Sequence, residues 1–278
     1  MRRIGFHRRT SLDDQKWAPS VGEEVVRLEN VHKSFADLVV FDGIDLTFRH
    51  GETTVVLGRS GSGKSILLKH IIGIMRPDSG RVLVLGHDLT KLNLHELESL
   101  RMNFGMVFQS SALFDSLDVL HNVGFLLYEH TGKGEEEIRR IVGERLAMVG
   151  LVGVEKMMPE ELSGGMKKRV ALARAIAMDP HIVLYDEPTT GLDPVTADSI
   201  NDLIIKMQKE LRATSIVVTH DMVSAYRIAD RIVMLYEGKI IIDDTPEGIR
   251  ASGDPRVQRF VRSEAVLSRS GAESGGGG

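Results

Sequence analysis

The sequence contains no cysteine, which excludes disulfide frameworks and cysteine-ligated zinc sites and permits a reducing compartment. Long apolar runs are also missing: Ile182 to Tyr185 and Ile216 to Val218 fall far short of the roughly 18 to 20 residues that a membrane-spanning helix needs. Neither sign of charge dominates, because 35 basic and 39 acidic side chains leave a formal net charge of -4. This balance predicts no overall attraction to nucleic acid and limits any membrane contact to local patches.

Hydrophobic residues make up 42% of the sequence, enough to bury a sizeable core. Short β-like segments from Val25 onward predict a small sheet, in which Asp42-Gly43 and His50-Gly51 mark turns. Further along, strands alternate with helices and predict a parallel sheet with helical crossovers. Between these two parts, helical periodicity from Leu92 to Gly150 predicts a mostly helical lobe.

These segments predict an α/β domain at residues 23–252, with the helical lobe at about residues 89–163. A flexible tail is expected at residues 1–22 and another at residues 253–278. Within the second tail, Asp254 to Val261 has apolar residues at the spacing of an amphipathic helix. Val257, Phe260 and Val261 would then dock on the body of the domain or on a neighbouring subunit; a frayed surface turn is the alternative.

A glycine-rich loop follows the buried strand predicted at Thr53 to Leu57 and precedes a predicted helix. It matches the P-loop pattern with the residues Gly58, Arg59, Ser60, Gly61, Ser62, Gly63, Lys64 and Ser65. In such a loop, backbone N–H groups curl around phosphate oxygens, Lys64 reaches the β- and γ-phosphates, and the Ser65 hydroxyl suits Mg²⁺. A flexible Gly/Ser turn is the alternative, but the strand before and the helix after favour a nucleotide site.

Two carboxylates, Asp186 and Glu187, directly follow the predicted strand that ends at Tyr185. Parallel sheets place their ligands at the carboxyl ends of the strands. Asp186 suits the metal ion, directly or through a water, and Glu187 suits a general base that polarises the attacking water. Alone, the pair could be an ordinary helix-initiating turn; the P-loop upstream favours the functional interpretation.

The segment Leu162-Ser163-Gly164-Gly165 precedes an alanine-rich helix. Ser163 could be only an N-cap, but a serine with free N–H groups at a helix N-terminus is also a phosphate site. With this tetrapeptide the sequence resembles the ABC ATPase family, whose signature is Leu-Ser-Gly-Gly, over roughly Val25 to Ile249. The resemblance implies a P-loop NTPase fold with a RecA-like parallel-sheet core, an antiparallel β subdomain and an inserted α-helical signature subdomain.

The resemblance also implies that ATP and Mg²⁺ are the cofactors and assigns roles to further residues. Gln109 resembles the Q-loop glutamine that senses Mg²⁺ and the attacking water. Asp193, in Gly191-Leu192-Asp193, resembles the D-loop aspartate, and His220 resembles the switch histidine that contacts the γ-phosphate. Phe35 resembles the aromatic residue that stacks on adenine, although an aromatic near a strand is more often a packing residue.

An assembly follows from the same resemblance. Each nucleotide would lie between the P-loop of one subunit and Ser163, Gly164 and Gly165 of a second copy, in a head-to-tail dimer. An integral membrane permease would hold this dimer peripherally on the cytoplasmic face of the inner membrane. Four segments are further similar to the ATPases of MCE-type lipid transporters, the Mla phospholipid group: Leu113 to Leu117, Glu129 to Thr131, Gly164 to Arg169 and Leu184 to Pro194. That similarity implies an MCE-domain protein and, in some systems, a STAS-domain subunit.

Three other functions remain open at this point. An ATPase of a small-solute importer would share all of these motifs. An ABC ATPase that acts on DNA or ribosomes would need long coiled coils or a second P-loop, and the sequence has neither. A P-loop kinase would leave Ser163 and His220 without a role.

Overall fold

Two β-sheets form the framework of the chain in the computed structural model, which describes residues 19–262. The larger sheet has the strand order β10-β9-β3-β8-β7-β6. Its strands are β3 (Thr53–Leu57), β6 (Phe104–Val107), β7 (Ile182–Asp186), β8 (Thr214–Thr219), β9 (Arg231–Tyr236) and β10 (Lys239–Asp244). Neighbours from β9 to β6 pair in parallel, and β10 pairs antiparallel with β9. The predicted parallel-sheet core is therefore confirmed.

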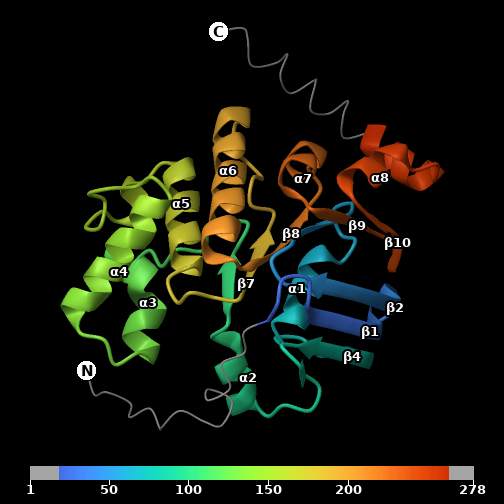
Figure 1. Cartoon of the computed structure of the whole chain (residues 1–278), viewed down its shortest axis with the longest axis horizontal. Coiled ribbons are helices and arrows are strands. Elements are labelled where there is room, and N and C mark those ends of the chain that lie inside the picture. The colour runs from blue at the N-terminus through green and yellow to red at the C-terminus, as the bar shows by residue number, and fades with distance from the viewer. Residues whose placement is uncertain (1–18, 263–278) are drawn as a thin grey trace, which may run out of the picture.

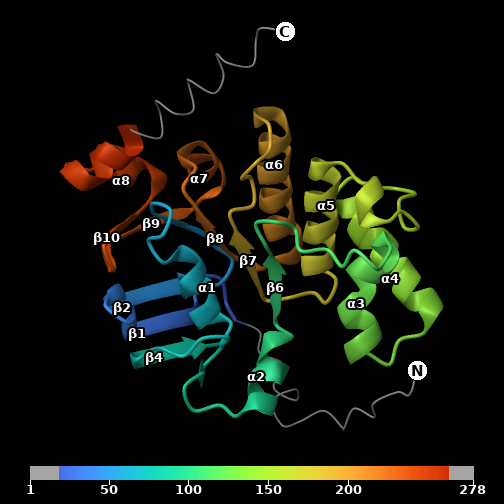
Figure 2. The same cartoon turned by 180° about the vertical axis from the view of Figure 1, so that it is seen from behind.

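Helices cover this sheet on both faces (Figures 1 and 2). They are α1 (Lys64–Ile71), α2 (Leu94–Arg101), α3 (Val119–His130), α4 (Glu135–Met148), α5 (Gly164–Ala175), α6 (Pro194–Leu211), α7 (Met222–Ile228) and α8 (Pro246–Ala251), with a 3₁₀ turn at Pro159–Glu161. Because alternate strand residues face opposite sides, Val217 packs into one core with α5 and α6, whereas Ile216 and Val218 pack into the other with α1. Burial on both faces explains the unbroken apolar runs of these strands.

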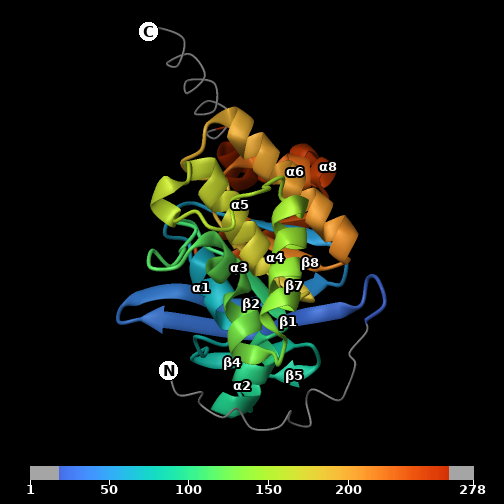
Figure 3. The same cartoon turned by 90° about the vertical axis from the view of Figure 1, so that its left-hand side faces the viewer.

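The smaller sheet contains β1 (Glu24–Phe35), β2 (Leu38–Arg49), β4 (Ser79–Val84) and β5 (His87–Asp88), all antiparallel, in the order β2-β1-β4-β5. Figure 3 shows β1 and β2 running across the molecule. The turn predicted at Asp42-Gly43 is wrong, because β2 continues through it. Gly43 has φ +74 where the register shifts, while Asp42 and Ile44 still pair with β1. The glycine forms a bulge, since the apolar residues on both sides bury into the same core.

Helices α3, α4 and α5 pack together as a lobe at one end of the molecule (Figure 1). The mostly helical lobe predicted from Leu92 to Gly150 is interrupted by β6, which is an edge strand of the larger sheet. Phe104 and Val107 are buried there, and a Cβ at Gly105 would lie 2.2 Å from the Ala175 carbonyl oxygen. A strand of four residues is too short to change a periodicity measured over longer windows.

The predicted C-terminal amphipathic segment is helical at residues 255–262. Val257 and Phe260 are buried in the core that contains α6 and α7, and Val261 packs against it. Docking on the body of the chain is therefore confirmed. The tails predicted at residues 1–22 and 253–278 lie largely outside the described residues. Within residues 19–262, no helix combines the length and hydropathy that crossing a bilayer would require.

Candidate nucleotide site

The P-loop connects β3 to α1 and folds around the ammonium group of Lys64. Lys64 is only 6% exposed, and its Nζ donates to the carbonyl oxygens of Gly58 at 2.7 Å and Arg59 at 3.2 Å. Gly63 has φ +101 at the N-cap of α1, and no side chain caps this helix. A Cβ at Gly63 would lie 2.7 Å from Val40 Cγ1, so the close approach requires glycine. The first N–H groups of α1 are therefore available to an anion.

The loop also fits a polyphosphate in its donor groups and its shape. The buried hydroxyl of Ser62 has no hydrogen-bond partner among the described residues. A Cβ at Gly58 would lie 2.4 Å from that hydroxyl oxygen and would narrow the loop. Backbone N–H groups, a free hydroxyl and a buried ammonium together are the donors that phosphate oxygens accept from.

Strand β7 brings a carboxylate to the same end of the sheet. Ser65 Oγ donates to Asp186 Oδ1 at 2.9 Å, which joins the start of α1 to the end of β7. Burial raises the pKa of Asp186, while the hydrogen bond from Ser65 and the charge of Lys64 lower it in part. Hydroxyl and carboxylate oxygens are ligands that Mg²⁺ prefers, so this pair fits a magnesium ion.

Glu187 is the most densely connected carboxylate of the site. It is 8% exposed, and its Oε1 lies 3.3 Å from Lys64 Nζ. Its Oε2 accepts from Thr190 Oγ1 and Thr219 Oγ1, each at 3.1 Å, and lies 3.0 Å from His220 Nδ1. Burial raises the pKa of Glu187, but the hydrogen bond with His220 and the charge of Lys64 outweigh it and leave the pKa lowered. An ionised carboxylate at neutral pH can accept a proton.

The backbone of Glu187 is held in an uncommon conformation. Its φ is +49, which non-glycine residues rarely adopt, and its N–H donates to the Val218 carbonyl at 2.9 Å. The bond to β8 fixes the direction in which the carboxylate leaves β7. Strain of this kind is often found at functional sites.

Some of the predicted site residues form no hydrogen bond or ion pair with the cluster around Lys64 and Glu187 in the described part of the chain. Ser163 Oγ accepts from the Met166 N–H at 3.3 Å and caps α5, and Asp193 caps α6 through the Thr196 N–H at 3.0 Å. Among residues 19–262, neither forms a hydrogen bond or ion pair with the P-loop. The signature segment, which includes Gly164 and Gly165, is therefore not bonded to the P-loop of the same chain through Ser163.

Gln109 and Phe35 also lie outside the cluster around Glu187. The Gln109 carbonyl oxygen accepts from Lys168 Nζ at 2.6 Å, and the residue is exposed after β6. Phe35 is 43% exposed at the end of β1, with Lys33 Nζ 5.3 Å from its ring centroid. An exposed ring can accept a stacked base, but no contact of the chain with itself tests that role.

Sequence reasoning missed Thr190, Thr219 and Lys168. Thr219 directly precedes His220, so its position at the end of β8 was a usable signal. Thr190 follows Glu187 by three residues and carries no signal of its own. Lys168 lies in a helix with several basic residues, which usually indicates a solvated face; its burial depends on tertiary contacts.

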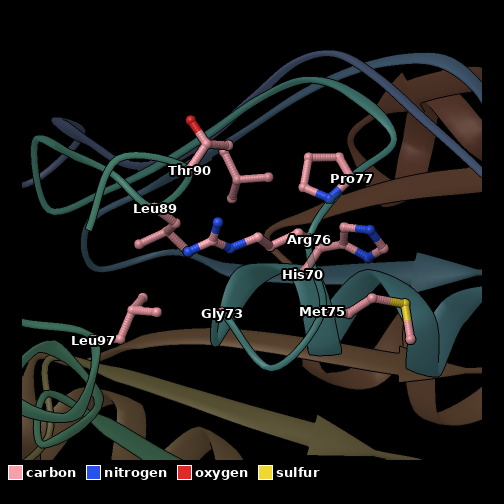
Figure 4. Close-up of a pocket in the computed structure, with 9 residues that line it drawn as sticks. His70, Gly73, Met75, Arg76, Pro77, Leu89, Thr90 and Leu97 are labelled. Atoms are coloured by element: carbon pink, nitrogen blue, oxygen red, sulfur yellow. The ribbon is translucent and has the colours of Figure 1, made fainter. Parts of the chain in front are cut away.

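A small cavity elsewhere in the molecule is not part of this site. His70, Gly73, Arg76, Leu89 and Leu97 are among its lining residues (Figure 4). None of them belongs to the P-loop or to the residues after β7. The cavity separates the C-terminal part of α1 from α2 and the segment around β5.

Comparison with known proteins identifies the family to which this chain belongs. The model of the ABC transporter family matches residues 41–190. This span includes the P-loop, the signature segment and Glu187. The chain belongs to the ABC transporter family. As a cassette of this family it is a P-loop NTPase that binds nucleotide and hydrolyses ATP.

This ABC ATPase is similar to proteins with named functions. It is 40% identical to the intermembrane phospholipid transport system ATP-binding protein MlaF of Haemophilus influenzae, over 88% of this chain and 93% of that protein. It is 39% identical to the probable ribonucleotide transport ATP-binding protein mkl of Mycobacterium tuberculosis, over 90% of this chain and 72% of that protein. Among solved structures, it is similar to the ATP-binding cassette MJ0796, a dimer in a post-hydrolysis state bound to ADP and Pi, with a TM-score of 0.73, 34% identity and coverage of 80% of this chain and 98% of that one.

Proposed function

We propose that this ABC ATPase energises the transport of phospholipid across a cell envelope, as the cassette of an MCE-type transporter. The similarity to MlaF carries the proposal, because it extends over nearly the whole of that protein at 40% identity. The segments noted in the sequence, from Leu113 to Leu117 and around Glu129-His130-Thr131, support the same subfamily. The functional unit would be residues 23–252, with the lobe within about 89–163 and helix 255–262 as a docked extension.

In this proposal the cluster at the carboxyl ends of β3, β7 and β8 performs the hydrolysis. Lys64 and the N–H groups of α1 would hold the β- and γ-phosphates, and Ser65, Asp186 and Gln109 would hold Mg²⁺. A bound Mg²⁺ would neutralise the charge that develops on the phosphates. Glu187 polarises the attacking water, because its pKa is low enough to keep it ionised. His220, hydrogen-bonded to Glu187, would contact the γ-phosphate.

Two copies of the chain would complete two such sites. Among the described residues, Ser163 forms no hydrogen bond with the P-loop of its own chain, and MJ0796 is a dimer; both observations support a head-to-tail arrangement. Asp193 would lie at the interface, and Phe35 would stack on adenine. A membrane permease would hold the dimer peripherally at the inner membrane, with an MCE-domain protein and a STAS-domain subunit as further partners.

A second candidate is transport of a small polar solute. The similarity to mkl, a probable ribonucleotide transport ATP-binding protein, at 39% identity favours it. The nucleotide site would be the same in both cases, because hydrolysis does not depend on the cargo. The partners and the bound cargo separate the two candidates.

The test is to capture the Glu187→Gln variant, with its partners, from detergent-solubilised native membranes and to identify proteins and lipids by mass spectrometry. We expect a permease, an MCE-domain protein and phospholipid. Recovery of a solute-binding protein would favour the second candidate. Recovery of no membrane protein, with a bait that still binds ATP, would overturn the transport assignment.

A further inference from the structure

The backbone between β6 and α3 is unusual directly after Gln109. Ser111 and Ala112 are consecutive non-glycine residues with φ +65 and +46. Non-glycine residues rarely adopt this backbone conformation, so two in succession persist only where other contacts hold them. Ser111 is also buried. The groups that hold this segment should therefore be visible around it.

Two cations of α5 bind the carbonyl oxygens of the segment. Lys168 Nζ donates to the Gln109 oxygen at 2.6 Å, and Arg174 donates to the oxygens of Ser111 and Ala112, each at 2.7 Å. The guanidinium fork engages two successive carbonyls at once, which fixes their direction as well as their distance. Each of the strained residues is thus bonded to the same helix.

Burial of the Lys168 side chain opposes its positive charge. It is 5% exposed, and among residues 19–262 it forms no ion pair with a carboxylate. Burying an ammonium group without a close counter-charge is costly. The negative charges of Asp186 and Glu187 act on it favourably from a longer distance. Lys168 thus bonds α5 to the Gln109 backbone and is attracted by the carboxylates of the site. A role in the site explains this buried lysine better than packing does.

The other end of the segment is held by α3. Asn122 is fully buried; its Oδ1 accepts from the Phe114 N–H at 2.8 Å, and its Nδ2 donates to the carbonyl oxygens of Phe114, Leu117 and Asp118. The Phe114 ring also lies 5.9 Å from the Arg174 guanidinium carbon. Residues 109–118 are therefore a segment whose conformation is fixed by hydrogen bonds to α5 at one end and to α3 at the other.

We propose that Lys168 and Arg174 form a cationic clamp through which α5 sets the position of the Gln109 backbone, which makes both of them positioning residues of the ATPase reaction. Ser163, at the N-cap of the same helix, would share every displacement of α5 with this segment. The inference rests on the proposed roles of Gln109 and Glu187. It adds the physical connection between the signature segment and the Gln109 segment.

The chain offers a matched control for the clamp. Lys167 is next to Lys168 on α5 but its side chain forms no hydrogen bond or ion pair among the described residues. Lys167→Met and Lys168→Met remove the same charge from the same helix. Lys168→Arg restores a cation that can reach a carbonyl oxygen. The comparison separates the clamp from the general charge of α5.

The experiment measures steady-state ATP hydrolysis and hydrogen exchange of the full-length variants with Mg²⁺-ATP. For Lys168→Met we expect kcat to fall about 10- to 100-fold while KM for ATP changes little, because the phosphate cradle is intact but the Gln109 segment is displaced. Amides within residues 109–118 should exchange faster, without a change in β3 or β7. Lys167→Met should match the wild type, and Lys168→Arg should recover most of the loss.

Equal effects of Lys167→Met and Lys168→Met, or wild-type kcat and exchange in Lys168→Met, would overturn the clamp. If Lys168→Met does not fold, Arg174→Lys replaces it: this variant keeps the charge but loses the planar guanidinium fork that directs one N–H group at each carbonyl oxygen, so exchange at 111–112 should rise in a folded chain. Unchanged exchange would reject the clamp. The exchange measurement needs no hydrolysis, so it tests the clamp even if the wild-type chain is inactive. An inactive wild-type chain would count against the proposed function and not against the clamp.

Discussion

At the scale of single residues, the proposed chemistry depends on one ionised carboxylate. Glu187 is buried, which disfavours its charge, yet Lys64, His220 and two threonine hydroxyls stabilise the charged form. The same contacts fix the direction of the side chain. A general base needs both features, a vacant proton site and a fixed position.

Glu187→Gln should therefore abolish most turnover and leave nucleotide binding intact. Glutamine keeps the shape and can still accept hydrogen bonds, but it cannot accept a proton. We expect kcat to fall about 10²- to 10⁴-fold, measured by phosphate release, with ATP affinity close to that of the wild type. Glu160→Gln, the same change at an exposed position, is the control. Near-normal turnover in Glu187→Gln would reject the base assignment.

A second prediction at this scale concerns His70, which is buried on α1. Burial lowers the pKa of His70, and its Nε2 has no partner among the described residues. The folded pKa is thus below the unfolded value of about 6.5. Above that value both states are neutral and stability is complete; as pH falls below it, the unfolded chain binds the proton first and stability decreases.

We expect the free energy of unfolding to fall between pH 7 and pH 5, by up to about 1.4 kcal/mol per pH unit for each buried histidine. His70→Phe should reduce this slope, because phenylalanine carries no titratable group; its ring replaces the aromatic ring that meets Phe41 edge-on. Urea unfolding at several pH values checks the slope, and the measurement at pH 8 isolates any packing cost. A slope identical to that of the wild type would show that His70 does not contribute.

At the scale of elements, the sequence predicted what repeats locally and missed what depends on distant contacts. The strand at Thr53–Leu57 and the helix after the P-loop follow from an apolar run, a glycine loop and a change of period. Strand β6 was missed because its four residues gain their partner only from β7, far along the chain. The bulge at Gly43 was missed because an Asp-Gly pair predicts a reversal unless the pairing partners on both sides are known.

The same division applies to the candidate site. Asp186, Glu187 and His220 could be predicted together because each follows a strand of one parallel sheet, and the carboxyl ends of such strands meet. Lys64 and Ser65 follow from the P-loop pattern. Nothing in the local sequence indicated Thr190. The basic residues around Lys168 indicated a solvated helix face, which was misleading, since only its neighbours in three dimensions distinguish it from Lys167.

The C-terminal helix leads to a prediction at the scale of elements. Phe260 is 6% exposed at the end of the described chain and packs into the core that contains α6. Truncation of a buried phenylalanine typically destabilises a protein by about 3 to 5 kcal/mol, so Phe260→Ala should lower the unfolding free energy by about that amount. Phe108→Ala, at an exposed ring, is the control and should cost much less. Equal, small losses would show that the helix contributes little to the fold.

At the scale of the whole molecule, the P-loop and the signature segment lie on different elements of the chain. The cradle lies at the ends of β3, β7 and β8, and Ser163 lies at the exposed start of α5 in the lobe (Figure 1). A single chain therefore presents a P-loop and a signature segment without joining them. Two copies related by a twofold axis would present each group to the other, and every such contact would occur twice.

Mixing two inactive variants tests this arrangement. Lys64→Ala damages the cradle, and Ser163→Asp keeps an N-cap acceptor on α5 while placing a negative charge against the phosphates. In a head-to-tail dimer of the two variants, one site carries both changes and the other carries neither. If the sites act independently, activity should rise toward about one quarter of the wild type, because half of the dimers are mixed and each keeps one intact site. Each variant mixed with itself is the control. If differently tagged copies associate yet activity stays absent, the signature segment does not act across the dimer.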